Sequence, residues 1–234
     1  MAAIAISGLV KTYGKQNAVD NLTATIAKGR ITGFLGPNGA GKSTTLRCLV
    51  GLSAPTSGTA LIYDKRYRDL DNPLSQVGTV LDSRAFHTAL TGKQNLRVVA
   101  AAAGIPDSRV DEVLEMVELK DAAGKRMKNY SLGMKQRLAL AGAILGDPEI
   151  LILDEPANGL DPAGIAWLRK FLRKLAEGGR TILVSSHQLA EMQNTVDDVL
   201  IINKGKLIAS GSMKEVIGDA SLEDTFLALT GGEL

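Results

Sequence analysis

The chain has 234 residues, of which 45% are hydrophobic and 22% are charged, and its formal net charge is +2. This composition excludes an intrinsically disordered chain, and the near balance of charges excludes a strongly basic surface for nucleic acid or anionic lipid. The single cysteine, Cys48, excludes an internal disulfide and is typical of a reducing compartment.

The sequence predicts no segment that spans a membrane or directs secretion. Its longest apolar run, residues 138–146, contains nine residues, whereas a helix needs about 20 to span a bilayer. The first cationic residue is Lys11, and no basic region precedes an apolar stretch at this end. We therefore expect the chain to reside in the cytoplasm.

Short apolar runs bounded by charged or glycine-containing turns predict β-strands along much of the chain. They cover residues 3–7, 23–27, 30–35, 59–63, 77–81, 150–153, 181–184 and 199–202. Several of them are apolar throughout, which is typical of strands in a sheet covered by helices on both faces. The pattern indicates an α/β fold.

Helical patterns replace the strands between residues 91 and 146. Three helices are predicted there, near 95–103, 108–118 and 135–145, which indicates a helical lobe inserted into the α/β core. Residues 161–177 predict another amphipathic helix. A capping pattern at Ser221 and Asp224 begins a short C-terminal helix, for which we expect a structural docking role.

A glycine-rich motif follows the predicted strand at 30–35. Residues 36–43 fit the P-loop pattern G-x-x-x-x-G-K-[ST] and precede a predicted helix at 44–50. Backbone N–H groups of such a turn converge on phosphate oxygens, and the helix N-terminus adds the positive end of its dipole. The motif predicts that Lys42 meets the β and γ phosphates and that the Ser43 hydroxyl binds Mg²⁺. The expected nucleotide-binding residues of this segment are Gly36, Pro37, Asn38, Gly39, Ala40, Gly41, Lys42, Ser43 and Thr44.

Two acidic residues, Asp154 and Glu155, end the apolar run at 150–153. Ligands of open α/β sheets bind at the carboxyl ends of the strands, so both carboxylates are expected to face the phosphates. We expect Asp154 to bind Mg²⁺ through a water molecule and Glu155 to be the general base that activates the attacking water. The alternatives are a plain glycine turn and a strand that ends in a solvated acidic turn.

Together with the segments at 130–137, 158–162 and 185–187, these motifs resemble the ATP-binding cassette (ABC) transporter ATPases. The resemblance covers nearly the whole chain and is greatest to stand-alone ATPase subunits of bacterial exporters for drugs and peptide antibiotics. It implies a P-loop NTPase core with a mostly parallel central sheet, an N-terminal antiparallel β subdomain and an inserted α-helical subdomain. Within this single domain, residues 1–84 and 150–217 would form the nucleotide-binding core, 85–149 the helical subdomain and 218–234 a C-terminal docking helix.

The resemblance also implies an activity and its partners. The subunit would hydrolyse ATP to ADP and phosphate with Mg²⁺, in a homodimer or a pair with a similar ATPase that sandwiches two ATP molecules. The dimer would drive a separate transmembrane permease from the cytoplasmic face of the membrane. It would be a peripheral protein that binds no nucleic acid.

Residues of the further segments have roles that this resemblance implies. Ser131 and Gly133 would contact the γ-phosphate held by the partner's P-loop, and Asp161 would cross the dimer interface. His187 would bind the γ-phosphate and position water, while Tyr13 would stack on adenine. Ser131 and Asp161 are equally suited to be helix N-caps, and Tyr13 to cap the edge of an N-terminal sheet.

Two segments depart from the family pattern. The usual signature Leu-Ser-Gly-Gly-Gln has Leu132 here in place of its first glycine and Met134 in place of its glutamine. In the loop after the strand at 77–81, Asp82 occupies the place of a glutamine. Its carboxylate can bind Mg²⁺ or water but cannot donate a hydrogen bond as an amide does, so Asp82 is either a metal ligand or a plain loop acid.

Two other classes of protein compete with this interpretation, and a third is a weaker alternative. ABC-type ATPases that act on ribosomes or DNA usually carry two cassettes or a long coiled coil, and one P-loop in 234 residues provides neither. An immunity or sensor module that works by ATP occupancy would not need the hydrolytic residues Glu155 and His187. A small-molecule kinase is disfavoured by the segment at 131–133.

Overall fold

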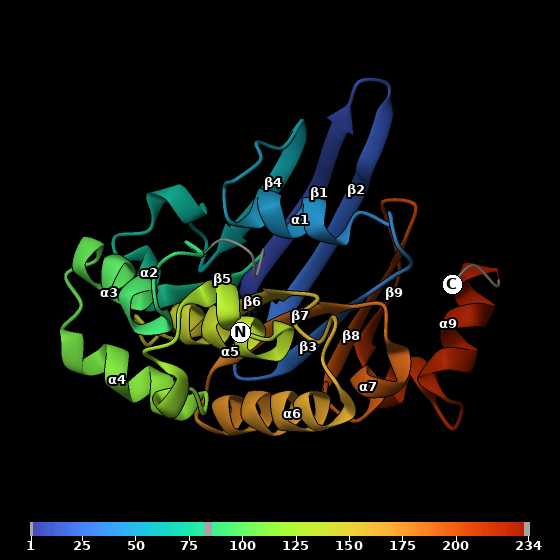
Figure 1. Ribbon diagram of the computed structural model, residues 1–234. Helices are drawn as coiled ribbons and strands as arrows, with labels where there is room; N and C mark the ends of the chain where they lie inside the picture. The colour runs from blue at the N-terminus through green and yellow to red at the C-terminus, as the bar shows by residue number, and fades with distance from the viewer. Residues whose placement is uncertain (1, 82–85, 232–234) are drawn as a thin grey trace.

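The structure is a computed structural model that describes residues 2–81 and 86–231. A central sheet of six strands organises the molecule (Figure 1). The strand order is β5-β6-β7-β3-β8-β9, with the first five strands parallel and β9 antiparallel to β8. The strands are β3 (Ile31–Leu35), β5 (Val77–Val80), β6 (Ile150–Asp154), β7 (Thr181–Ser186), β8 (Asp198–Asn203) and β9 (Lys206–Ser212).

A second sheet of three antiparallel strands, ordered β2-β1-β4, covers one face of the central sheet. It consists of β1 (Ala2–Tyr13), β2 (Gln16–Ala27) and β4 (Ser57–Ile62). The β1–β2 hairpin projects well beyond the central sheet (Figure 1). The α/β class, the mostly parallel central sheet and the antiparallel N-terminal sheet are therefore confirmed.

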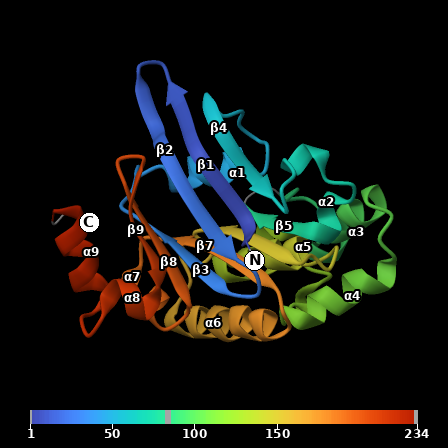
Figure 2. The ribbon, with the colours of Figure 1, turned by 180° about the vertical axis from the view of Figure 1, so that it is seen from behind.

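Helices fill the connections between the strands and cover the other face. The α-helices are α1 (Lys42–Leu49), α2 (Pro73–Gln76), α3 (Gly92–Ala102), α4 (Asp107–Met116), α5 (Leu132–Ala143), α6 (Pro162–Glu177), α7 (Leu189–Gln193), α8 (Met213–Ile217) and α9 (Leu222–Thr230). Single 3₁₀ turns lie at Tyr67–Asp69, Lys120–Ala122 and Met127–Asn129. In the rear view, α6 lies along the face of the central sheet opposite the β1–β2 hairpin (Figure 2). Among the described residues, no helix is both long enough and apolar enough to span a bilayer.

The strands of the central sheet supply side chains to two cores because successive residues of a strand point to opposite faces. In β6, Leu151 and Leu153 join the core under α3 to α6, whereas Ile150 and Ile152 join the core beneath the antiparallel sheet and α1. Cys48 of α1 lies in this second core, where burial raises the pKa of its thiol. This burial on both faces explains why the runs are apolar throughout.

Several elements differ from the sequence-based expectation. Helix α1 begins at Lys42, two residues before the predicted start, and β1 and β2 are longer than their apolar runs. Strand β9 was not predicted because it is an edge strand in which apolar residues such as Ile208 are exposed and none is fully buried, so it lacks the alternation of a half-buried strand. The helices α2, α7 and α8 have four or five residues, too few to show a helical period.

The C-terminal helix α9 begins at the predicted N-cap. The Ser221 hydroxyl accepts a hydrogen bond from the Asp224 N–H at 3.0 Å and donates one to the Asp224 carboxylate at 2.7 Å. Leu222 and Phe226 are buried, while Leu229 near the end of the helix is 40% exposed. One side of α9 therefore packs on the molecule, whereas Leu229 in its last turn faces solvent.

Gly78 in β5 sets how closely α5 approaches the sheet. A Cβ atom built at Gly78 would overlap the backbone carbonyl oxygen of Ala143 in α5 and lie 2.8 Å from Leu151. We expect Gly78→Ala to lower the free energy of unfolding by about 1–3 kcal/mol, the usual cost of overpacking a core. Urea denaturation measures this. Gly124→Ala is the control, because nothing lies within 4 Å of its added Cβ, and equal midpoints for the two variants would contradict the packing argument.

Candidate active site at the P-loop

The turn from β3 into α1 lies where the strand–turn–helix order of the P-loop motif requires it. Gly41 is the N-cap of α1 and has a φ of 104°, a conformation that residues with a side chain rarely adopt. A Cβ atom at Gly41 would also overlap the carbonyl oxygen of Ala18 in β2. Glycine is therefore required here both by the backbone conformation and by the close approach of the neighbouring strand.

Strand β2 and the β8–β9 turn fasten the P-loop from outside. The N–H of Gly205 in the β8–β9 turn donates to the carbonyl oxygen of Ala40 at 3.0 Å. The carbonyl oxygen of Gly205 in turn accepts from the N–H of Asp20 at 2.9 Å. We call the residues Asp20, Ala40 and Gly205 the P-loop clasp.

A hollow of about 240 Å³ opens at the N-terminus of α1. The first turn of a helix has N–H groups without intrahelical acceptors, and these groups together with the helix dipole favour an anion. Seven consecutive residues of the P-loop segment line the hollow, from 38 to 44, and Ala18, Glu155 and Asn158 complete its wall. The sequence-predicted phosphate site and the predicted general base thus border one space.

Lys42 is the cation of this hollow, although its side chain is only 6% exposed. Its ammonium donates to the carbonyl oxygens of Gly36 at 2.7 Å and Pro37 at 3.2 Å. It also lies 3.4 Å from the Glu155 Oε1 atom. Because an unpaired buried charge is costly, these contacts explain how the fold tolerates a buried ammonium.

Both carboxylate oxygens of Glu155 contact other side chains, and its backbone conformation is unusual. Its Oε2 atom lies 2.6 Å from Nδ1 of His187, and its Oε1 atom faces Lys42. Its φ of 50° is unusual for a residue with a side chain. The carboxylate and the imidazole come together because β6 and β7 are parallel neighbours that end at the same edge.

Ser185 is a site residue whose role the sequence analysis did not identify. Its hydroxyl donates to Asp154 Oδ1 at 2.6 Å and accepts from the Glu155 N–H at 3.0 Å. The side chain is fully buried in β7, directly opposite Asp154 in the strand register. The only available signal was its place two residues before His187, which does not reveal a contact with another strand.

The donor atoms suit a nucleoside triphosphate with Mg²⁺. Ser43 offers a hydroxyl and Asp154 a carboxylate, the oxygen donors that Mg²⁺ prefers. Within residues 2–81 and 86–231, no group of three or more His, Cys, Asp or Glu side chains is arranged to hold a metal ion. A site of two protein oxygens fits Mg²⁺, which usually keeps water and substrate phosphate oxygens as its other ligands.

The remaining predicted residues lie outside the hollow. Ser131 is the N-cap of α5 and accepts a hydrogen bond from the Met134 N–H at 3.2 Å. Asp161 is the N-cap of α6 and accepts one from the Gly164 N–H at 2.7 Å. The two side chains and Gly133 do not line the hollow. Asp82 falls outside the described residues.

Tyr13 lies at the end of β1 and is also not part of the hollow's wall. Its side chain is 51% exposed. Its hydroxyl lies 3.4 Å from the Ser53 hydroxyl, and the Lys11 ammonium lies 4.9 Å from the centre of its ring. The structure therefore leaves about half of Tyr13 open to solvent.

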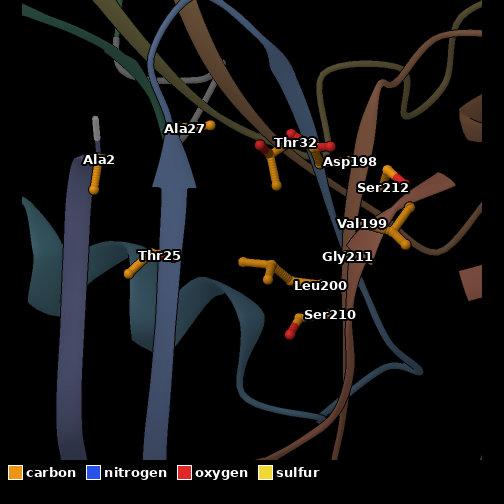
Figure 3. Close-up of a pocket in the computed structure, with 10 residues that line it drawn as sticks. All are labelled: Ala2, Thr25, Ala27, Thr32, Asp198, Val199, Leu200, Ser210, Gly211 and Ser212. Atoms are coloured by element: carbon orange, nitrogen blue, oxygen red, sulfur yellow. The ribbon is translucent and has the colours of Figure 1, made fainter. Parts of the chain in front are cut away.

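A second hollow, of about 390 Å³, lies between β2 and β9 (Figure 3). Thr25 of β2 and Ser210 of β9 stand on its two sides, and Leu200 and the buried Thr32 lie between them. Asp198, the one charged residue in its lining, forms an ion pair with Arg30, in which Nε of Arg30 lies 2.6 Å from Oδ2 of Asp198. This hollow has no lysine or arginine in its wall, so it does not compete with the P-loop hollow as a phosphate site.

Comparison with known protein families supports the motif analysis. The sequence profile of the family described as "ABC transporter" matches residues 19–158. The bacitracin transport ATP-binding protein BcrA of Bacillus licheniformis is 45% identical over 88% of this chain and 68% of its own. The lantibiotic transport ATP-binding protein SrtF of Streptococcus pyogenes is 37% identical over 94% of both chains.

Solved structures agree with this result. An ATP-binding subunit of an ABC transporter superimposes with a TM-score of 0.87 at 28% identity, over 97% of this chain and 99% of that one. A dimeric ATP-binding cassette in a post-hydrolysis state, bound to ADP and Pi, superimposes with a TM-score of 0.81 at 25% identity. That match covers 90% of this chain and 98% of the cassette.

The Ser185 hydroxyl is expected to hold the acidic turn in its active geometry. Ser185→Ala leaves the Asp154 carboxylate and the Glu155 N–H each without a partner, which we expect to cost about 1–3 kcal/mol of unfolding free energy. We also expect kcat to fall about tenfold or more through misplacement of Glu155, with ATP affinity nearly unchanged. Thermal melts and phosphate release measure the two effects.

The control for the Ser185 variant removes a buried hydroxyl that makes no hydrogen bond. Thr32 Oγ1 is buried without a hydrogen-bond partner in the described part of the chain. Thr32→Val is therefore expected to leave stability unchanged or raise it. If Thr32→Val lowered the free energy of unfolding as much as Ser185→Ala, the loss of any buried hydroxyl would account for the destabilisation, and the hydrogen bonds of Ser185 would not.

Proposed function

The chain belongs to the ABC transporter family as an ATP-binding subunit whose ATPase activity is coupled to transport, and from that membership we propose the role of each site residue. The supporting observation is the line of contacts from Lys42 through Glu155 to His187, at the edge of the P-loop hollow. These are a cation, a base and a positioning group in the order that hydrolysis of a phosphoanhydride needs. An alternative action on ribosomes or DNA has no support among the relatives named above.

Binding of the triphosphate would use the backbone and one charge. The N–H groups of the first turn of α1 and the Lys42 ammonium would bind the phosphate oxygens. Ser43 and Asp154 would hold Mg²⁺, which when bound neutralises charge that develops on the phosphates. Tyr13 would stack on the adenine ring, and the exposure of its side chain is suitable for that contact.

Hydrolysis would proceed by attack of one water molecule on the γ-phosphorus. As the new oxygen–phosphorus bond forms, the bond between the γ-phosphorus and its bridging oxygen breaks, and ADP leaves. The Glu155 carboxylate would accept the proton that the water loses. His187 would keep that carboxylate and the water in place, as the 2.6 Å contact between the two side chains indicates. Ser185 would fix the backbone of the same turn.

The assembly we propose is a pair of subunits that sandwiches two ATP molecules. Ser131 and Gly133 would contact the γ-phosphate in the partner's P-loop, and Asp161 would lie at the interface. Their position outside the P-loop hollow of their own subunit supports this arrangement, because their N-terminal helix ends remain exposed for another ligand. The dimeric cassette bound to ADP and Pi is a structural precedent.

We propose that the pair drives a separate membrane permease as a peripheral complex on the cytoplasmic face. The bacitracin and lantibiotic transport proteins among its relatives support a drug- or peptide-like substrate, carried in the direction of export. We also propose 85–149 as the helical subdomain, 218–234 as the docking helix, and 1–84 with 150–217 as the nucleotide-binding core.

The general-base role of Glu155 is tested by Glu155→Gln. The amide keeps the shape of the side chain but cannot accept the proton, so we expect turnover to fall by about 10²–10⁴-fold with ATP affinity retained. The variant is also expected to accumulate as an ATP-bound dimer. Phosphate release and size-exclusion chromatography with and without ATP measure these outcomes.

Glu115→Gln is the control for that variant, since the Glu115 side chain is 67% exposed in α4 and far from the hollow in sequence and fold. It is expected to hydrolyse ATP at the parent rate. Near-normal hydrolysis by Glu155→Gln would remove Glu155 from the base role.

The phosphate cradle is tested by Lys42→Ala. The loss of the one cationic side chain in the hollow is expected to weaken ATP binding by about tenfold or more, since each tenfold change is worth about 1.4 kcal/mol. Isothermal titration of ATP measures the affinity, and circular dichroism checks the fold. Lys128→Ala, which removes an exposed cation, is the control; ATP affinity unchanged in Lys42→Ala would contradict the assignment.

A further inference from the structure

Leu132 is a large apolar side chain at an unusual place, the first residue of α5, directly after the N-cap Ser131. It is 48% exposed, although it belongs to a helix whose later apolar residues are buried. Its side chain lies against Gly159, which is 27 positions further along the chain and belongs to the loop between β6 and α6. We call residues 155–161 the β6–α6 loop.

The contact between Leu132 and Gly159 is close and exclusive. A Cβ atom built at Gly159 would overlap Cδ2 of Leu132 and lie 3.3 Å from its Cγ. Apart from Gly159 itself and its two chain neighbours, no other residue of the described structure would have an atom within 4 Å of that Cβ. The space above Gly159 is therefore closed by Leu132 alone, and shortening Leu132 would make room for a methyl group there.

The β6–α6 loop joins this contact to the hollow that faces the phosphates. Asn158 lines the P-loop hollow, and its N–H donates to the carbonyl oxygen of Glu155 at 3.1 Å. The carbonyl oxygen of Asn158 accepts from Nε2 of the buried Gln136 in α5 at 3.4 Å. The loop thus contacts α5 at Gln136 and again at Leu132, one turn earlier.

These contacts form a continuous path from the acidic turn to the exposed end of α5. The path runs from Glu155 through Asn158 and Gly159 to Leu132, which is bonded covalently to Ser131. A displacement of the loop at the hollow would move the seat on which the first turn of α5 rests. The Ser131 hydroxyl, already held by the Met134 N–H, would move with that turn.

We propose that Leu132 is a positioning residue that seats the Ser131 end of α5 on Gly159, and so couples the phosphate hollow of one subunit to the surface that it offers to a second copy. The inference rests on the proposed function, because it assumes that Ser131 completes the ATP site of the partner. Leu132 itself touches neither ATP nor the attacking water in this scheme. It acts by fixing where the Ser131 N-cap stands.

A double-mutant cycle on ATP-driven dimerisation tests the proposal. In the Glu155→Gln background, Leu132→Ala and Gly159→Ala are each expected to raise the dimer dissociation constant in ATP about tenfold. The loss caused by Gly159→Ala is expected to be smaller in the Leu132→Ala background than in the parent, because the shortened side chain at position 132 leaves room for the methyl group, whereas the cost of a side chain at the Gly159 φ of 73° is the same in both backgrounds. Sedimentation velocity across a range of protein concentrations measures the four constants.

Two further variants separate positioning from a general loss of structure. Leu132→Met keeps an apolar side chain of similar reach and is expected to restore dimerisation to within about twofold of the parent. Leu229→Ala removes a leucine of comparable exposure, 40%, from α9 and is expected to change nothing. The affinity of each monomer for ADP, measured by titration, is expected to stay the same, since Leu132 does not line the hollow.

The outcomes distinguish the inference from the proposed function on which it rests. Additive effects in the cycle, or a Leu132→Ala variant that dimerises like its parent, would overturn the coupling role while the ATP-sandwich dimer stands. A Glu155→Gln parent that does not dimerise in ATP would overturn the proposed function and the inference together. In that case, the same four variants measured by urea denaturation would still show whether Leu132 and Gly159 interact, because non-additive changes in the free energy of unfolding indicate a direct contact.

Discussion

Parallel pairing of β3, β7 and β6 is the constraint on which the site depends. In the register, Leu35 at the end of β3 lies beside Ser186, and Asp154 at the end of β6 lies beside Ser185. The ends of these three strands therefore lie at one edge of the sheet, although the end of β3 is more than 100 residues away in sequence from the ends of β6 and β7. The P-loop, the acidic turn and His187 need no long side chains to meet, because the strands deliver them to the same place.

Charge compensation within that edge is equally specific. The Lys42 ammonium is buried among carbonyl oxygens and one carboxylate, and the Glu155 carboxylate has a cation on one side and an imidazole on the other. Removal of Lys42 or Glu155 would take a charged partner from the other, and a largely buried charge is costly when its partner is lost. The same contacts that make the groups suitable for chemistry also hold them in fixed positions.

Local sequence patterns predicted a large part of this arrangement. The strand before Gly36, the acids after the run at 150–153 and the N-caps Ser131 and Asp161 follow rules that involve only nearby residues, and the structure has each of these elements. Ser185 and the pairing of Leu132 with Gly159 were not predictable in this way, since each joins residues about 30 positions apart. Strand β9 does not alternate between buried apolar and exposed polar residues, and the helices α2, α7 and α8 are too short to give a periodic signal. The catalytic and interface roles of these residues remain proposals.

The P-loop clasp bears on the thermodynamics of phosphate binding. Because Gly205 bonds both to Ala40 of the turn and to Asp20 of β2, hydrogen bonds within the chain itself hold the turn in shape. Fixing one flexible backbone residue costs about 1–2 kcal/mol of conformational entropy, and here folding has already met that cost. A triphosphate that enters the hollow finds its amide donors preorganised, so less of its binding free energy is offset by ordering of the turn.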